Sequence, residues 1–135
     1  MESKFESKIG KITSTPEKIY NFLSDFRNFS SLIPHDKLKN WNAQENECTF
    51  SIEMIGNVGI QIIEKQPFVL IKITGIEGSK LDFFFWIQIK EVAPYDSRIK
   101  LTLKADLNPM VKMIASKQIQ SMMDTLVDQI VKIPF

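Results

Sequence analysis

Apolar residues recur at every second position through most of the stretch from about residue 38 to residue 107. This alternation puts neighbouring side chains on opposite faces and is typical of β-strands that bury one face of a sheet. The turns between these strands are short, and short turns join antiparallel strands, because parallel strands need long crossovers. The missing βαβ crossovers also exclude a doubly wound fold. The middle of the chain therefore predicts an antiparallel sheet of about six strands.

Two hairpins within this sheet have a predicted register. In the first, Met54 pairs with Val58 across a three-residue loop that ends in Asn57, a residue that tolerates the left-handed conformation. In the second, a three-residue loop over residues 77–79 puts Ile73 on the same face as Phe85, whereas a two-residue loop would put Lys72 there. A one-residue slip moves every side chain to the other face, so we expect the odd-length loop.

The segments on either side of the predicted sheet carry helix signals and one further strand. Residues 4–12 alternate loosely, with Phe5, Ser7 and Ile9 on one parity. Residues 15–17 supply a Thr cap, a Pro at the first helical position and an early Glu, so they predict a helix start. A second short helix is expected from Asn28 to Ile33. Asn108 and Pro109 then cap a long amphipathic helix. Its expected buried stripe is Val111, Ile114 or Ala115, Ile119, Met122, Leu126, Ile130 and Ile133.

The charge balance bears on the partners. The 135 residues include 17 Lys plus Arg and 16 Asp plus Glu, a formal net charge of +1, with no long basic run. A nucleic-acid binder usually concentrates positive charge, so we expect no nucleic-acid partner. No apolar stretch reaches the roughly 20 residues of a membrane span, so no stable membrane insertion is expected. Cys48 is the only cysteine, which fits a reducing compartment, and the polar N-terminus predicts a cytoplasmic protein.

The ordered set of elements resembles the helix-grip fold of the START-like superfamily (SRPBCC), which includes the birch pollen allergen, lipid-transfer domains and polyketide cyclases. Residues 15–26, the strand and turn over 62–67 and the helix from Asn108 carry the resemblance, which covers essentially the whole chain. It implies an α+β fold in which a curved antiparallel sheet of about seven strands wraps around a long C-terminal helix, with two short helices after the first strand. It also implies one START-like domain over residues 1–135.

Members of this superfamily hold a hydrophobic ligand between the sheet and the C-terminal helix, so the resemblance implies an apolar small-molecule ligand here. The turn over residues 56–59 does not match the glycine-rich loop of the plant members, so no binding residue is carried over from them. Methionines near the start of the long helix suit an adaptable cavity wall. The residues expected to line the cavity are Phe26, His35, Met54, Ile60, Ile71, Phe83, Phe85, Leu101, Leu103, Met110, Met113 and Ile114.

Catalytic chemistry has few candidate residues. The inward strand parities hold almost no charged residues, and acid–base catalysis needs a titratable group beside the substrate, so binding is favoured over catalysis. A catalytic dyad of Cys48 and His35 is conceivable. Cys48 shares parity with Phe50, however, so we predict a buried and inert thiol. With one His and one Cys in the chain, we expect no metal site and no cofactor. We predict no catalytic residue. A cyclase, aromatase or dehydratase would need several of Tyr20, His35, Trp41, Cys48 and Asn108 to converge.

Phe84 and Trp86 alternate with Phe83 and Phe85, so one of the two pairs faces outward. An exposed aromatic pair is a sticky patch. It is either a homodimer contact or is covered by Leu70 and neighbouring long side chains. Three functions therefore stay open: a carrier or sensor of a lipid, isoprenoid or polyketide-like molecule, an enzyme on the same fold, and a protein-interaction module.

Overall fold

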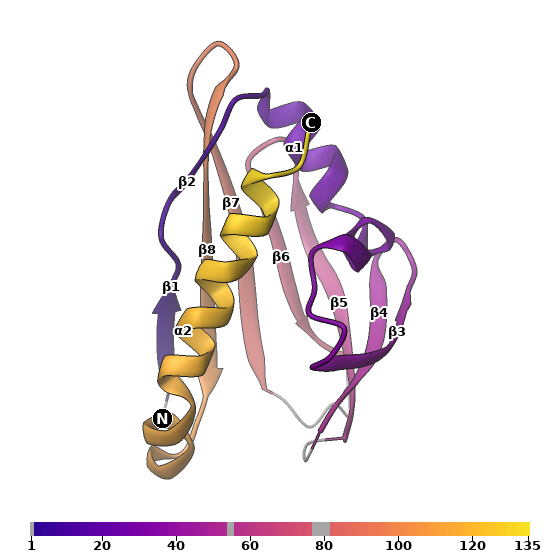
Figure 1. Cartoon of the computed structure of the whole chain (residues 1–135), viewed down its shortest axis with the longest axis vertical. Coiled ribbons are helices and arrows are strands. Elements are labelled where there is room, and N and C mark those ends of the chain that lie inside the picture. Colours follow the sequence, from indigo (N-terminus) through magenta and orange to yellow (C-terminus); the bar gives the residue numbers. More distant parts are fainter. Residues whose placement is uncertain (1, 54–55, 77–81) are drawn as a thin grey trace.

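The computed structural model describes residues 2–53, 56–76 and 82–135. Its elements are β1 (Glu2–Glu6), β2 (Gly10–Ile12), α1 (Pro16–Leu23), the 3-10 helix η1 (Phe26–Ser31), β3 (Leu38–Ala43), β4 (Glu47–Ile52), β5 (Gly56–Gln66), β6 (Leu70–Gly75), β7 (Phe83–Ala93), β8 (Asp96–Asp106) and α2 (Pro109–Val131). The strands form one antiparallel sheet in the order β1-β8-β7-β6-β5-β4-β3, and β2 also pairs with β8. The sheet is curved, and α2 runs along its concave side (Figure 1). The predicted α+β class, antiparallel sheet and long C-terminal helix are confirmed.

The first predicted strand is interrupted. Both β1 and β2 pair with β8, but the chain leaves the sheet between Glu6 and Gly10. Ser7 bridges the gap, because its N–H donates to the Leu101 carbonyl and its Oγ accepts from the Leu101 N–H, each at 2.9 Å. The break leaves Ile9 65% exposed, so Ile9 does not share the buried face of Phe5. This interruption raises the strand count from about seven to eight.

The two predicted hairpin registers both differ from the structure, but each predicted face is kept. Val58 lies opposite Phe50 and not opposite Met54, so that predicted register is wrong by four residues. A shift of four preserves the face, and Val58 and Phe50 are both buried. Met54 lies outside the described residues, as does the turn over residues 77–79. Ile73 lies opposite Phe85, so the predicted shared face is confirmed. A three-residue loop over 77–79 would instead pair Ile73 with Phe83, so that predicted register is wrong by two residues.

The helices begin where the caps predict. Thr15 Oγ1 accepts from the Lys18 N–H at 3.3 Å, and Asn108 Oδ1 accepts from the Val111 N–H at 2.9 Å. The second short helix is a 3-10 helix that starts at Phe26, two residues earlier than expected, with Asp25 as its cap. The last helix ends at Val131. No helix in the described ranges is long and apolar enough to cross a membrane.

The buried face of α2 differs from the predicted stripe. Met123, Val127 and Ile130 are each 1% exposed, whereas Met122 is 49% exposed. Val111 and Ile114 are exposed as well. The helix packs against β1, β2 and β8, at one side of the sheet, and this docking sets which flank is buried.

Candidate functional site

The concave face of the sheet is tightly filled at one end. Residues directly opposite one another on antiparallel strands carry their side chains on the same face, so the register defines rows across it. In one row Leu101 faces Ile87, which faces Ile71, and these side chains are at most 1% exposed. The short helix α1 packs over β6 and β7. It lies at the end of the sheet where α2 finishes (Figure 1). This end is hydrophobic core.

The same face becomes less covered toward the start of α2. In the next row Leu103 faces Phe85, Phe85 faces Ile73, and Ile73 faces Ile62. Only Ile73 of these four is fully buried. One row further, Phe83 and Ile60 are also half-buried. We call Ile60, Ile62, Phe83, Phe85 and Leu103 the open apolar face. These five side chains pack on the core on one side and remain partly accessible on the other.

The predicted lining residues divide into distinct groups. Four of them, Ile60, Phe83, Phe85 and Leu103, belong to the open apolar face. Three others, Phe26, Ile71 and Leu101, are 0% exposed and lie in the packed core. Ile71 and Leu101 lie on the same face as the open apolar face, in the adjoining row. The structure leaves none of the three a free surface for a ligand.

The residues expected from the start of α2 lie elsewhere. Met110, Met113 and Ile114 are 68%, 80% and 68% exposed. Side chains this exposed bury little surface against the sheet, so the structure does not bring them together with the open apolar face. The reason is that α2 packs onto the body through its later turns, at Met123 and Val127, rather than through its first ones.

Further apolar residues join the site from β3 and β4. Leu38 lies opposite Ile52, and both are half-buried. The Trp41 ring stacks on Phe50 with centroids 5.6 Å apart and an interplanar angle of 23°. The alternation of the sequence could not have placed Trp41 on this face, because the register shifts between Lys39 and Asn42.

The same arrangement of sheet and helices occurs in solved structures. Norcoclaurine synthase from Thalictrum flavum matches with a TM-score of 0.74 and 15% sequence identity, over 98% of this chain and 93% of that chain. A START superfamily protein from Mycobacterium smegmatis matches with a TM-score of 0.65 and 13% identity, over 96% of both chains. The chain has the START-like, helix-grip fold.

A third match is the Aha1 dimer from Colwellia psychrerythraea, with a TM-score of 0.62 and 12% identity, over 96% of this chain and 97% of that chain. No protein-family model matches the sequence, and no curated protein matches it. The identities are low, so these likenesses show the START-like fold and do not show a ligand or an activity.

The candidate catalytic groups of this chain are each buried or engaged in a local hydrogen bond. Cys48 is 1% exposed, and burial raises the pKa of its thiol to about 12. Burial also raises the pKa of Tyr20. His35 Nε2 lies 2.6 Å from the Ser30 carbonyl oxygen, and Asn108 caps α2. Among the described residues, no group of three or more His, Cys, Asp or Glu could hold a metal ion.

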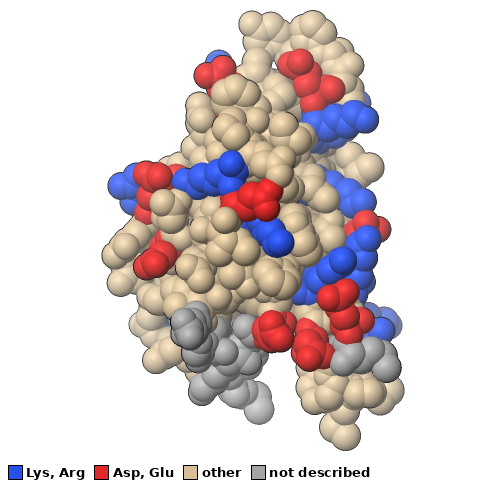
Figure 2. All heavy atoms as spheres, turned by 180° about the vertical axis from the view of Figure 1, so that it is seen from behind, with Lys and Arg blue, Asp and Glu red and all other residues tan. Residues whose placement is uncertain are grey.

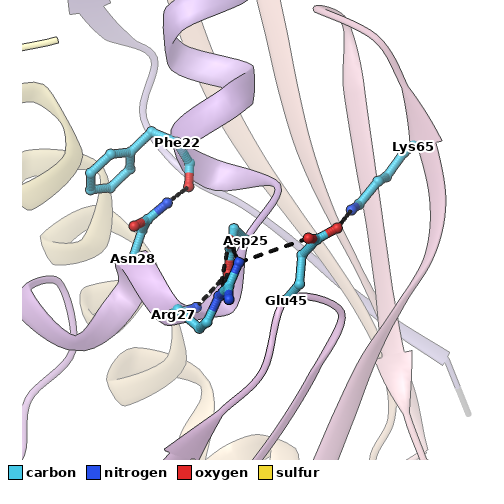
Figure 3. A network of polar contacts seen from close by, with 6 residues as sticks. All are labelled: Phe22, Asp25, Arg27, Asn28, Glu45 and Lys65. Atoms are coloured by element: carbon cyan, nitrogen blue, oxygen red, sulfur yellow. Dashed lines mark hydrogen bonds and ion pairs between the residues drawn. The ribbon is translucent and has the colours of Figure 1, made fainter.

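One charged residue does reach the concave side of the START-like sheet. The register shifts between Ile62 and Glu64, so Lys65 lies opposite Ile71 and shares its face. Its Nζ lies 3.4 Å from Glu45, at the edge of a polar network that also contains Asp25 and Arg27 (Figure 3). The bulge therefore adds one lysine to an inner face that was expected to hold almost no charge, and this lysine is ion-paired.

The same polar network holds η1 against the sheet. Arg27 donates to both carboxylate oxygens of Asp25 and lies 3.8 Å from Glu45, in the turn between β3 and β4. The Phe26 N–H donates to the Glu45 carbonyl at 3.0 Å. On the other side, Asn28 donates to the Phe22 carbonyl at 2.9 Å (Figure 3). These bonds fix the helices that close the filled end of the concave face.

A separate groove lies beyond α1, at the filled end of the molecule. It holds about 640 Å³ and includes the edge-to-face contact of Phe22 and Phe135, whose ring centroids are 5.5 Å apart. Its lining consists of Lys18, Asn21, Phe22, Ser31, Ile133, Pro134 and Phe135. None of these residues belongs to the concave site.

Proposed function

We propose that this chain binds an apolar small molecule, of the lipid, isoprenoid or polyketide type, between the sheet and α2. The open apolar face is the main support for this proposal. Its five large side chains, in adjoining rows, are left partly accessible on the concave side. Covering apolar surface releases about 25 cal/mol per Å², so a ligand that removes 150 Å² of it from water gains roughly 4 kcal/mol. Ligand sites are typically concave and mostly apolar.

A structural neighbour supports the class of ligand. One structure of norcoclaurine synthase from Thalictrum flavum holds dopamine and hydroxybenzaldehyde, which are small aromatic molecules. Its TM-score against this chain is 0.74 and its identity 15%. The shared fold supports a small-molecule site on the concave side, and the half-buried aromatic residues of this chain suit such molecules.

Catalysis is the second candidate, because norcoclaurine synthase is named as a synthase. The geometry here favours binding. Lys65 is paired with Glu45, and the Cys48 thiol has a raised pKa and is buried. If the chain is an enzyme that depends on its only histidine, His35→Ala abolishes turnover and leaves binding near normal.

Native mass spectrometry of freshly purified protein, followed by denaturing extraction, tests the binding proposal first. A copurified apolar mass supports a carrier and identifies the class of its ligand. A protein free of ligand is then titrated with acetylnaphthalene. Absence of binding at its solubility limit would count against the proposal.

Two neighbouring isoleucines on β5 provide a matched pair of variants. Ile62 belongs to the open apolar face, whereas Ile63 is 46% exposed outside it. Ile62→Trp fills space on the concave side and is expected to weaken ligand binding at least fivefold, with Ile63→Trp unchanged. Equal effects of the two substitutions would remove the open apolar face as the binding surface.

A further inference from the structure

Trp41 is held on the concave side by an irregular backbone. Asn40, the residue before it, has a φ of 56°, a left-handed conformation that few residues other than glycine, asparagine and aspartate adopt. The strand register shifts between Lys39 and Asn42, so β3 is bulged at this point. Bulges re-aim side chains and occur next to functional sites.

Side-chain hydrogen bonds fasten the bulge. Asn40 Nδ2 donates to Ser51 Oγ at 3.3 Å, and Ser51 Oγ donates to Asn57 Oδ1 at 2.8 Å. These two hydrogen bonds thus connect β3, β4 and β5 on the face opposite to the Trp41 indole. These hydrogen bonds stabilise the left-handed conformation of Asn40 and with it the inward position of Trp41.

The Trp41 indole carries an unused hydrogen-bond donor. Its ring is half-buried and stacks on Phe50, but the Nε1 atom is covered and has no hydrogen-bond partner within the described part of the chain. An indole N–H can only donate, and leaving a buried donor unpaired costs about 1–3 kcal/mol. Buried polar groups are nearly always paired, so this one calls for an explanation.

Among the described residues, the two cross-strand pairs that share the inner face beside Trp41 offer no side-chain acceptor. Residues that share the inner face nearby are apolar: Phe50 lies opposite Val58, and Leu38 lies opposite Ile52. A ligand that displaces the atoms covering Nε1 and brings an acceptor would pair the donor and relieve the cost of its isolation. The same donor would penalise a pure hydrocarbon, which leaves it unpaired.

We propose that the Trp41 N–H recognises an oxygen acceptor on the ligand, such as a ketone, ester or phenol oxygen. The inference rests on the proposed function and narrows it. The ligand class becomes apolar molecules with one such oxygen, docked on the open apolar face with the oxygen toward β3. Trp41 then acts as a specificity-determining residue.

The test compares two probes of similar shape, acetylnaphthalene and ethylnaphthalene, of which only the first has an oxygen acceptor. Binding is measured by titrating ¹⁵N-labelled protein. Trp41→Phe keeps an aromatic ring and removes the donor. This substitution is expected to weaken the binding of acetylnaphthalene about tenfold and to change the affinity for ethylnaphthalene less than about twofold. Trp86→Phe, on the convex face, is the control and leaves both affinities unchanged.

A second measurement covers the case in which Trp41→Phe folds poorly. In Trp86→Phe protein, Trp41 is the only tryptophan, so its indole N–H gives a single indole resonance. That resonance moves downfield with acetylnaphthalene and not with ethylnaphthalene. If Trp41→Phe weakens the binding of both probes equally, or if acetylnaphthalene leaves the indole resonance unshifted, the donor role is wrong. The apolar site would remain in either case. If the wild type binds neither probe, the proposed function itself fails.

Discussion

The backbone N–H of Lys8 donates a 2.8 Å hydrogen bond to Oδ1 of Asp124 in α2. Lys8 lies in the break between β1 and β2, where the chain leaves the sheet and its N–H loses a ladder partner. One turn earlier on α2, Gln120 Nε2 donates to the Glu6 carbonyl at 2.7 Å. The helix therefore satisfies the backbone groups that the break exposes, and these bonds fix its position along the concave side.

Asp124→Ala is expected to lower the free energy of unfolding by about 1 kcal/mol, because it leaves the Lys8 N–H without its acceptor. Asp128→Ala is the matched control on the same helix. It removes only the ion pair with Lys8 Nζ, whose partners are both about half exposed, and such pairs contribute little. Urea denaturation measures both, and a loss for Asp128→Ala equal to that for Asp124→Ala would contradict the backbone role.

Gly10 permits the close approach of β2 and α2. A Cβ at this position would lie 2.7 Å from Val127 Cγ1 and 2.9 Å from Val131 Cγ2. Gly10→Ala is therefore expected to displace the helix and to cost about 1–3 kcal/mol. Gly59→Ala is the control, because its Cβ would meet most closely the Cδ1 end of the Ile76 side chain, at 2.9 Å. In thermal unfolding, Val127→Ala should recover part of the Gly10→Ala loss, and strictly additive losses would refute the proposed clash.

The parts of the fold that the sequence predicts well are those that depend on local chemistry. Thr15 and Asn108 cap the helices they were expected to cap. Each cap depends only on a side-chain oxygen and the backbone N–H three residues later. The odd spacing between Ile73 and Phe85 follows from the need to keep one face apolar. Alternation alone thus predicted the sheet.

The parts that were missed depend on contacts distant in sequence. The long helix carries apolar residues on several flanks, so periodicity could not decide between Met122 and Met123 as the buried one. Contact with β1, β2 and β8 decides it. Bulges reverse parity without a mark in the pattern, which is why Trp41 was not placed among the lining residues and Lys65 was assigned no place on the inner face.

Asp25 is expected to make folding sensitive to acid. Its hydrogen bonds from the Arg27 guanidinium hold the pKa of Asp25 below its ordinary value of 3.8. A carboxyl whose folded pKa is below its unfolded pKa stabilises the fold above about pH 3.8, and this contribution is lost as the pH falls through the folded value. Asp25→Asn should therefore flatten the acid limb of the stability profile. Urea midpoints between about pH 2 and pH 6 measure it, and an unchanged slope would rule out this contribution.

Cys48 is expected to be unreactive in the native protein. Burial raises the pKa of its thiol to about 12 from an ordinary 9.0, so almost none of it is thiolate near neutral pH. A thiol-specific disulfide reagent should label Cys48 only after denaturation. Because the folded pKa is raised, stability should also decline as the pH rises above about 9. Rapid labelling of the native protein would revive the thiol as a candidate nucleophile.

The outward aromatic pair on β7 is covered by lysines. Lys72 Nζ lies 4.7 Å from the centroid of the Phe84 ring and 5.3 Å from that of Trp86, and Lys104 Nζ lies 5.8 Å from Trp86. Lys72 belongs to β6 and Lys104 to β8, the two neighbours of β7. Figure 2 shows charges of both signs distributed over the side of the molecule opposite to α2. Each such contact at an exposed site contributes about 0.5–1 kcal/mol and keeps the rings from presenting a bare patch.

Lys72→Ala is therefore expected to uncover Phe84, which is already 39% exposed, and to increase self-association in sedimentation velocity. Lys90→Ala, farther along the same face, is the control for loss of one charge. Trp86→Lys tests the homodimer hypothesis for the same pair. A shift from dimer to monomer would assign the contact to Phe84 and Trp86, and an unchanged sedimentation coefficient would remove this face as the dimer interface. Self-association that rises equally for both alanine variants would instead attribute the effect to net charge.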